Sequence, residues 1–392
     1  ALPIAIKAQE EGFTGFMLPT ANAKEAAIVG DLKVYGIDNI KQVLDFFDKG
    51  TPLEQTIIDT REEFYKNLDF PEFDFSDVKG QESIKRCMEI AAAGGHNVIL
   101  IGPPGAGKTM LAKRLPSILP PMTLHEALET TKIHSVVGKI KNMGLMSQRP
   151  FRSPHHTISD VALVGGGSYP QPGEISLSHN GVLFLDELPE FKRGVLEVLR
   201  QPLEDREVTI SRARFTVTYP SSFMLVASMN PSPGGYFNDP DAPVTSSPAE
   251  MQRYLSKISG PLLDRIDIHI EVTPVPFEKL SEERKGEGSV EIRKRVTAAR
   301  ELQTLRFAEL ENVHYNAQMN TKQIRAHCKL DDKSKSLLKN AMERLNLSAR
   351  AYDRILKVAR TIADLCGDSD LNGDHISEAI QYRSLDREGW LG

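Results

Sequence analysis

A glycine-rich stretch that ends in a lysine and a threonine is the strongest chemical signal in this sequence. The apolar segment Asn97–Ile101 runs into GPPGAGKT at residues 102–109, and a helical pattern follows. In this strand–loop–helix setting, backbone N–H groups converge on phosphate oxygens and the helix start adds partial positive charge. We predict an ATP site in which Lys108 reaches the β- and γ-phosphates and Thr109 contacts Mg²⁺. The residues expected to cradle the nucleotide are Gly102, Pro103, Pro104, Gly105, Ala106, Gly107, Lys108, Thr109 and Met110.

Two further apolar segments lead into residues that suit hydrolysis of the nucleotide. The segment Gly181–Leu185 is followed by Asp186 and Glu187, and another apolar segment shortly precedes Asn230. We expect Asp186 to hold Mg²⁺ together with Thr109, and Glu187 to orient the attacking water. Asn230 is placed to sense the γ-phosphate, although Asn before Pro is also common in ordinary turns.

The segments that carry these residues have the pattern of buried parallel strands. They are nearly continuous in apolar residues and alternate with helical patterns, which is typical of an α/β fold with a parallel sheet between helices. Because the carboxyl ends of parallel strands meet at one edge, the predicted catalytic residues are expected to lie together. The predicted strands are Asn97–Ile101, Gly181–Leu185, Ser222–Ser228 and Ile268–Val272.

We divide the chain into three predicted domains. Residues 1–68 read as a mixed α/β domain, residues 69–315 as the P-loop core, and residues 316–392 as a helical domain. Ser348 and Asn372 are candidate helix caps in the last domain. Within the first domain we predict strands at Ala1–Ile6, Gly15–Leu18 and Leu32–Tyr35, and helices from Asn22 and over Asn39–Phe47.

Residues 207–220, EVTISRARFTVTYP, have the alternation of a β-hairpin. Its turn carries Arg212 and Arg214, and Phe215 on the return strand is expected to pack. By itself this pattern fits either a solvated basic turn or a surface that contacts a substrate.

Composition narrows the class of protein. The 392 residues are 40% hydrophobic and carry a formal net charge of -5, which gives no global sign of nucleic-acid binding but leaves room for a local basic surface. No apolar run approaches the roughly 20 residues of a membrane span, and no signal peptide is visible, so we expect a cytoplasmic protein. Cys87, Cys328 and Cys366 are scattered as in a reduced protein. The start at Ala1 suggests the C-terminal part of a longer protein.

The motifs, taken together, resemble a known family over essentially the whole chain. The sequence is similar to the magnesium-chelatase-like ComM/YifB family of AAA+ ATPases. This resemblance implies an AAA+ core, a C-terminal helical lid, an N-terminal part of a Lon-protease-like domain, and assembly into a homo-hexameric ring. Beyond the P-loop and the Asp-Glu strand, it is carried by Arg149–Thr157, Val164–Gly167, Gly173–His179, Met251–Asp267 and Ser348–Asp364.

The resemblance also assigns roles to arginines. It implies that Arg265 is an arginine finger for the nucleotide of the neighbouring subunit, where a guanidinium stabilises charge on the γ-phosphoryl oxygens. The alternative is a surface ion pair of Arg265 with Asp264 or Asp267. Arg350 matches the sensor-2 arginine, with Arg354 as the alternative.

Three positions lead us to expect an absence. Family members often carry cysteines after the sensor Asn, but residues 230–236 and 245–248 have none, so we predict no zinc site. Lys7 lies near a Lon-type lysine but no nucleophilic Ser accompanies it, so we predict a solvated lysine and no peptidase activity. Adjacent His155 and His156 point apart on a strand or helix, which disfavours a metal site.

Three functions share this nucleotide chemistry. The first is a motor that translocates or branch-migrates DNA, the second remodels a partner protein for metal insertion, and the third unfolds proteins. The hairpin directly precedes the predicted sensor strand, as does the pre-sensor hairpin of the chelatase branch. Arg212 and Arg214 would then contact DNA phosphates in a central pore with little sequence preference. We therefore favour the DNA motor, with remodelling of a partner protein as the alternative.

Overall fold

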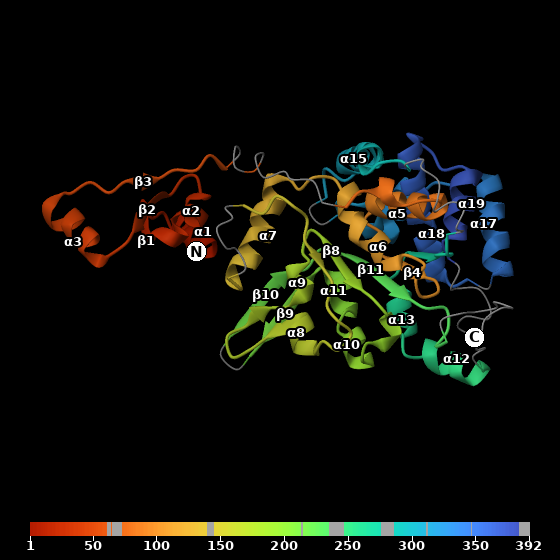
Figure 1. Cartoon of the computed structure of the whole chain (residues 1–392). Helices are drawn as coiled ribbons and strands as arrows, with labels where there is room; N and C mark the ends of the chain where they lie inside the picture. The colour runs from red at the N-terminus through yellow and green to blue at the C-terminus, as the bar shows by residue number, and fades with distance from the viewer. Residues whose placement is uncertain are drawn as a thin grey trace.

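The computed structural model of the chain contains an N-terminal α/β unit, a central parallel sheet between helices, and a C-terminal helical lid (Figure 1). The structure describes residues 1–60, 64, 73–138, 145–212, 215–234, 247–275, 286–310, 313–345 and 347–383.

The central sheet has five strands in the order β12-β4-β11-β8-β5, and every neighbouring pair is parallel. The predicted parallel sheet is therefore confirmed, and β5 is a strand that the sequence pattern did not reveal. In β4, Val98 and Leu100 face one apolar core while Ile99 and Ile101 face another, so both faces of the strand are buried. The strands are β12 Ile268–Glu271, β4 Val98–Ile101, β11 Met224–Met229, β8 Val182–Leu185 and β5 Phe151–Arg152.

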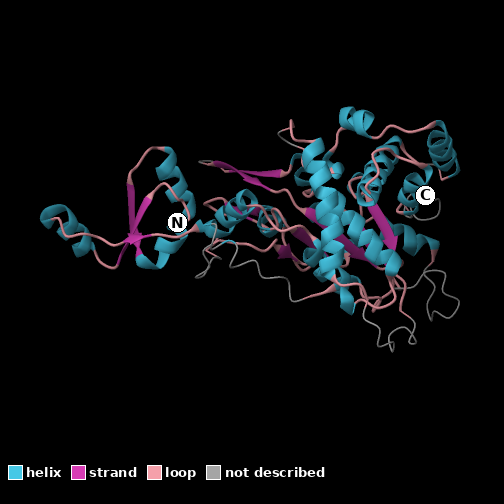
Figure 2. Cartoon of the chain, turned by 90° about the horizontal axis from the view of Figure 1, so that it is seen from above, coloured by secondary structure: helices cyan, strands magenta, loops and turns pink. Residues whose placement is uncertain are grey.

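Helices cover both faces of this sheet (Figures 1 and 2). One face packs against α5, α6, α15 and the lid, and the other packs against the shorter helices and the base of the hairpin. The helices of this region are α5 Glu82–Gly94, α6 Lys108–Arg114, α7 Leu124–Val136, α8 Asp160–Val164, α9 Glu174–Leu177, α10 Arg193–Glu197, α11 Arg200–Asp205, α12 Pro248–Leu255, α13 Gly260–Leu263 and α15 Ser289–Arg306. Short 3₁₀ turns are η1 Phe75–Asp77, η2 Leu115–Ile118 and η3 Leu188–Glu190.

Two small antiparallel pairs lie outside the central sheet. The predicted hairpin is confirmed: β9 Glu207–Ser211 pairs with β10 Thr216–Pro220. Beside it, β6 Gly165–Gly166 pairs with β7 Gln171–Pro172. In Figure 1 the β9–β10 pair lies next to α8 and α9.

The N-terminal unit extends to one side of the core and meets it at α7 (Figure 1). Its sheet, in the order β1-β2-β3, is parallel between β1 and β2 and antiparallel between β2 and β3. The amino group of Ala1 contacts Glu25 within the unit at 2.9 Å and the Ser135 hydroxyl of α7 at 3.3 Å. The elements are α1 Leu2–Glu10, β1 Gly15–Pro19, α2 Thr20–Ala27, β2 Lys33–Ile37, α3 Ile40–Lys49 and β3 Gln55–Thr56.

The prediction of a strand at Ala1–Ile6 is wrong, because these residues begin helix α1. A short apolar run fits a buried helix as well as a strand. Here Leu2 and Ala5 are buried at a spacing of three, and a Pro near the helix start has the backbone angle that a first turn needs. The strands predicted at Gly15–Leu18 and Leu32–Tyr35 are confirmed within two residues at each end.

The lid is helical, as predicted, and the side chains of Ser348 and Asn372 cap α18 and α19. Its helices are α16 Thr321–His327, α17 Asp332–Arg344, α18 Ala349–Cys366 and α19 Gly373–Gln381, preceded by η4 Asn316–Gln318. No helix in the part of the chain that the structure describes has the length and apolarity to cross a membrane.

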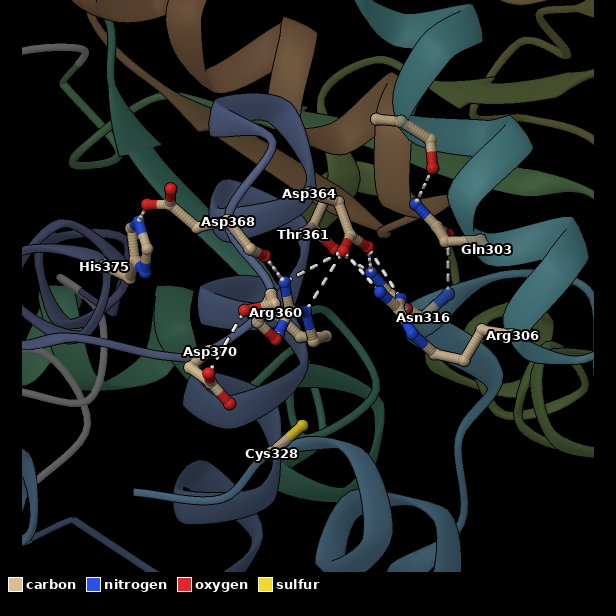
Figure 3. A network of polar contacts seen from close by, with 12 residues as sticks. Gln303, Arg306, Asn316, Cys328, Arg360, Thr361, Asp364, Asp368, Asp370 and His375 are labelled. Atoms are coloured by element: carbon tan, nitrogen blue, oxygen red, sulfur yellow. Dashed lines mark hydrogen bonds and ion pairs between the residues drawn. The ribbon is translucent and has the colours of Figure 1, made fainter. Parts of the chain in front are cut away.

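A buried carboxylate joins the lid to the core (Figure 3). Asp364 of α18 accepts hydrogen bonds from Arg306 of α15 at 2.5 and 2.7 Å, and from Arg360 at 3.1 Å. Asn316 donates to Asp364 at 2.7 Å and to Thr361 at 3.1 Å. Because charge-assisted hydrogen bonds at a buried site are strong and directional, this network fixes α18 against the helix that leads out of the core.

Candidate functional site

The carboxyl edge of the sheet gathers the predicted nucleotide-binding residues. Lys108 begins α6, and its amino group donates to the carbonyl oxygens of Gly102 and Pro103 at 2.5 and 2.9 Å. It also donates to the side-chain oxygen of Asn230 at 3.1 Å. Burial lowers the pKa of Lys108, while Asp186 and Glu187 act in the opposite direction. The predicted contact partners of the γ-phosphate, one on the P-loop and one on the sensor strand, therefore lie within hydrogen-bond distance of each other.

Three glycines of the P-loop are required by the backbone, and Gly105 is the first of two with a left-handed conformation, at φ of 79°. Gly107 has φ of 90°, a left-handed conformation that side chains strongly disfavour. Gly102 has no room for a side chain, because a Cβ atom there would lie 2.2 Å from the carbonyl oxygen of Val272. The loop thus passes close against the neighbouring strand and turns sharply into α6, as a phosphate-binding loop must.

The oxygen donors expected for Mg²⁺ come together. The Thr109 hydroxyl donates to a carboxylate oxygen of Asp186 at 2.8 Å. The other carboxylate oxygen of Asp186 accepts from the Ser228 hydroxyl and, at 3.1 Å, from the backbone N–H of Glu187. A hydroxyl and a carboxylate are the hard oxygen ligands that Mg²⁺ prefers, so these residues fit the cation. Ser228 is a partner of the site that the sequence prediction did not single out.

Glu187 lies half-exposed at this edge in a strained backbone conformation. Its φ of 54° is left-handed, which is uncommon for a residue with a side chain and is often found at functional sites. A carboxylate oxygen of Glu187 lies 3.5 Å from the Nδ1 atom of His156. Sequence reasoning missed this neighbour, although both residues lie in segments that carried the family resemblance.

The prediction that His155 and His156 point apart is wrong. They lie in a turn after β5, where the alternation of strands and helices does not apply, and their ring centroids are 4.1 Å apart. His155 instead contacts the Thr157 hydroxyl at 2.9 Å. No group of three or more potential metal ligands occurs among the residues that the structure describes.

The arginines predicted as finger and sensor 2 lie at the opposite edge of the sheet, away from the P-loop of their own chain. Arg265 follows α13 and precedes β12, at the amino end of the strands. It forms an ion pair with Glu204 and donates to the carbonyl oxygen of Pro261 at 2.5 Å. The alternative pairing of Arg265 with Asp264 or Asp267 is therefore not the arrangement observed.

Those two aspartates pair with the sensor-2 candidates. Arg350 contacts Asp264 at 2.5 Å and remains 71% exposed, whereas Arg354 contacts Asp267 at 2.9 Å and is mostly buried. Burial alone would raise the pKa of Asp267, but Arg354 and His96 hold it well below its usual range. Arg350, Arg354 and Arg265 thus lie along this edge, each in an ion pair with a carboxylate.

The hairpin tip is more aromatic than the sequence suggested. Phe215 was expected to pack, yet it is 46% exposed, and its ring centroid lies 6.1 Å from that of Tyr169 in the turn between β6 and β7. Tyr169 is 74% exposed and was not predicted as a site residue. Arg212 donates to the carbonyl oxygens of Ser211 and Gly167, at 3.1 and 3.4 Å. Arg214 lies outside the described residues.

Comparison with known proteins decides the family. The family described as magnesium chelatase, subunit ChlI, matches residues 74–280, and its C-terminal family matches residues 286–383. The competence protein ComM of Haemophilus influenzae is 45% identical over 386 residues, which cover 98% of this chain and 74% of ComM. This chain belongs to the ComM/YifB family of magnesium-chelatase-like proteins.

Two further relatives resemble this ComM/YifB member to different extents. The protein YifB of Salmonella typhimurium is 44% identical over 374 residues, covering 95% of this chain and 71% of YifB. The magnesium-chelatase 38 kDa subunit of Rhodobacter capsulatus is 26% identical over 184 residues, covering 42% of this chain and 52% of that subunit. The chelatase family supports an AAA+ ATPase that uses nucleotide and Mg²⁺.

Two departures of this ComM/YifB member from the family pattern can be located. Lys7 is exposed on α1 and contacts Glu10 and Glu11 at 3.4 and 3.7 Å, which fits a solvated lysine on a helix. The cysteine-free loop begins within the described residues, at Asn230, but residues 235–246 lie outside them. The predicted lack of zinc and of peptidase activity, and the Lon-like assignment of residues 1–68, stay predictions.

Proposed function

We propose that this chain is a cytoplasmic subunit of a homo-hexameric ring ATPase that translocates or branch-migrates DNA. The observation that carries the ATPase part of this proposal is the division of catalytic groups between the two edges of the sheet, and the β9–β10 hairpin carries the DNA part. Lys108, Thr109, Asp186 and Asn230 converge at the carboxyl edge, while Arg265 lies at the amino edge. A complete hydrolytic site then requires two chains.

The carboxyl edge would bind the nucleotide and activate water. Lys108 would exchange its carbonyl partners for the β- and γ-phosphate oxygens, and Thr109 and Asp186 would hold Mg²⁺. Mg²⁺ neutralises charge that develops on the phosphates. Glu187 would orient the attacking water, and Asn230, already next to the Lys108 amino group, would contact the γ-phosphate.

The amino edge of a neighbouring chain would supply the arginine that the carboxyl edge lacks. A strand of four residues, such as Val98–Ile101, separates the edges by about 13 Å at about 3.3 Å per residue. A finger on the amino edge therefore serves the nucleotide of a neighbour, and repeated head-to-tail contacts of this kind close into a ring. Arg350 and Arg354 lie on the same edge, so the sensor-2 role would also be served between subunits.

The hairpin is the proposed DNA contact. It connects directly to β11, the strand that leads to Asn230, so a movement at the nucleotide can reach its tip through one strand. Arg212 offers a guanidinium for phosphate, and the exposed rings of Tyr169 and Phe215 offer stacking surfaces for unpaired bases. The similarity to ComM, a competence protein, supports a DNA-related role.

The same two rings favour one alternative. Exposed aromatic side chains in a pore can also contact an extended polypeptide, so remodelling of a partner protein remains the second candidate function. The match to the magnesium chelatase ChlI family is consistent with it.

ATPase measurements with single-stranded, duplex and branched DNA at two salt concentrations test the proposal. We expect at least one DNA to stimulate turnover, and the stimulation to weaken at higher salt because phosphate contacts release counterions. Stimulation by an unfolded protein with no response to any DNA would replace the DNA motor with the second candidate.

A further inference from the structure

A small cavity at the amino edge of the central sheet is lined by an unusual number of guanidinium groups. The cavity has a volume of about 110 Å³ and lies where β4, β8, β11 and β12 begin, on the far side of the sheet from the P-loop. The arginines among its lining residues are Arg149, Arg206, Arg265, Arg300 and Arg354.

Three carboxylates near this cavity are each paired with one of these arginines. Glu204 pairs with Arg265, and Asp267 pairs with Arg354. Arg149 pairs with Glu126 of α7 at 3.1 Å. Because another guanidinium already engages each of these carboxylates, none of them is a dedicated partner of Arg300.

Arg300 has no carboxylate within ion-pair distance among the residues that the structure describes. Its guanidinium donates through Nε and Nη2 to the carbonyl oxygen of Ala92, at 3.1 and 2.7 Å. It also lies over the Tyr315 ring, 3.6 Å from the centroid. Burial lowers the pKa of Arg300 and that of Arg206, because removing a cation from water disfavours its charged form.

Three polar side-chain atoms of the cavity lining are buried without a hydrogen-bond partner among the described residues. One is the Oδ1 atom of Asp267, which lies 2.9 Å from Arg354 in an ion pair. The other two, the Nε atom of Arg265 and the hydroxyl oxygen of Ser221, can donate. Buried donors are normally satisfied, so an orphaned pair in one cavity indicates an acceptor that binds there. The combination of clustered guanidinium groups and orphaned donors selects an anion with several acceptor oxygens.

The backbone conformation of Arg206 is a further observation in favour of a ligand in this cavity. It ends α11 in a left-handed conformation with φ of 59°, where a Gly would be unstrained. A long cationic side chain thus occupies a position whose left-handed backbone favours Gly. Strain retained in this way is a recurrent feature of binding sites.

We propose that this cavity, which we call the amino-edge pocket, binds a phosphate-class oxyanion through Arg206, Arg300, Arg265 and the Ser221 hydroxyl. The volume is sufficient for a phosphate group with accompanying water, since one water occupies about 30 Å³ in the liquid. The oxyanion can come from the nucleotide of a neighbouring chain or from phosphate in solution. The pocket rests on the proposed function and deepens it in the first case, and is independent of it in the second.

The test measures phosphate binding where the P-loop cannot contribute. In the Lys108→Ala chain, inorganic phosphate at constant ionic strength is expected to raise the thermal midpoint saturably, and calorimetry gives its Kd. Adding Arg206→Gly removes one charge and relieves the left-handed strain, and the thermal midpoint of this variant without phosphate checks that it folds. It should bind phosphate about tenfold more weakly or worse, because a charge-assisted hydrogen bond is removed.

Two further variants exclude a general effect of charge or of folding. Ser221→Ala in the same background removes an orphaned donor at little cost to folding and should weaken phosphate binding by a smaller factor than Arg206→Gly. Lys294→Gln removes one charge from the exposed face of α15, the helix that also carries Arg300, and should bind phosphate like its parent. Absent phosphate binding in Lys108→Ala, or equal binding after Arg206→Gly, overturns the pocket.

The source of the oxyanion follows from turnover of Arg206→Gly with Lys108 intact. A reduced ATPase rate assigns the pocket to the nucleotide of the neighbouring chain, and an unaltered rate assigns it to phosphate from solution. Because the phosphate measurement uses a chain without a working P-loop, its failure is distinguishable from failure of the proposed ATPase.

Discussion

The two edges of the central sheet differ in how far one chain completes them. At the carboxyl edge, each predicted group has its partner in the same chain: Lys108 meets Asn230, and Thr109 meets Asp186. At the amino edge, several guanidinium groups line one cavity, and the Nε atom of Arg265 is buried without a partner among the described residues. The first edge holds the groups proposed to bind the nucleotide, whereas the second holds the guanidinium groups proposed to act on the nucleotide of a neighbouring chain.

In the proposed ring, this difference would let a single parallel sheet serve two nucleotide sites. Loops at the carboxyl ends of strands form a ligand site in the usual way for open α/β sheets. Loops at the amino ends face the opposite direction, so cations placed there reach a nucleotide only across an interface. Substitutions can therefore change one edge and leave the other intact.

The largest effect is expected from the carboxyl edge. Lys108→Ala removes the cation that faces the phosphates, and we expect ATP affinity to fall roughly 100-fold or more. Lys113→Ala, on the same helix α6 but outside the P-loop, is the matched control and should bind ATP normally. Isothermal titration with ATP and Mg²⁺ provides the measurement. Retained affinity in Lys108→Ala would refute the P-loop assignment.

A mixing experiment can show whether the two edges act in different chains. Arg265→Ala and Glu187→Gln should each lower turnover by about 10³-fold or more, since one removes the finger and the other the water-orienting carboxylate. Mixing the two variants should restore part of the ATPase rate, because some interfaces then combine an intact Glu187 with an intact Arg265.

A mixture confined to one edge is the control for that experiment. Lys108→Ala and Glu187→Gln both alter the carboxyl edge, so every interface keeps one defect and no rate should return. Equal rates from the two mixtures would show that Arg265 does not act between chains.

Substitutions in the hairpin are expected to have a smaller effect, because they leave both edges of the sheet unchanged. Arg212→Ala together with Arg214→Ala should abolish the stimulation of the ATPase by DNA. The rate with DNA should then be about equal to the rate without DNA, and this basal rate should be retained. The salt dependence of DNA binding should also fall, by about one unit for each phosphate that the variant no longer neutralises. Lys294→Ala with Lys335→Ala, two exposed lysines on α15 and α17, controls for net charge. Undiminished stimulation in the hairpin variant would contradict its role in binding DNA.

The exposed rings of Tyr169 and Phe215 can distinguish a DNA contact from a polypeptide contact. Tyr169→Ala with Phe215→Ala should weaken binding of single-stranded DNA more than binding of duplex, because stacking needs unpaired bases. If these changes abolish stimulation by an unfolded protein and leave DNA binding intact, the hairpin serves the alternative function.

The central sheet and the carboxyl edge were predictable because their signals are local. Four of its strands are nearly continuous apolar runs, and the P-loop specifies its own backbone through Gly102 and Gly107. Strand β5 was missed because Phe151–Arg152 is only two residues long and is recognised by its pairing with β8. The strand predicted at Ala1–Ile6 failed because a short apolar run does not separate strand from helix.

The amino edge was less predictable because its contacts are nonlocal. The sequence placed Arg265 beside Asp264 and Asp267, but tertiary packing gives it Glu204 from α11. Arg206 and Arg300 are far apart along the chain and carry no motif, so their shared cavity emerges only from the fold. Likewise, Tyr169 and Phe215 come from different turns, and their pairing had no sequence signal.

The smallest expected effect concerns a neighbour of Glu187, the proposed water-orienting carboxylate. His156 lies 3.5 Å from Glu187, which has a left-handed backbone and a half-exposed side chain. His156→Ala should therefore lower kcat roughly two- to fivefold, the range of a partly exposed pair, with KM for ATP unchanged. His155→Ala is the matched control, because that ring contacts Thr157 and not Glu187. A raised KM with unchanged kcat in His156→Ala would show that this ring supports nucleotide binding and does not position Glu187.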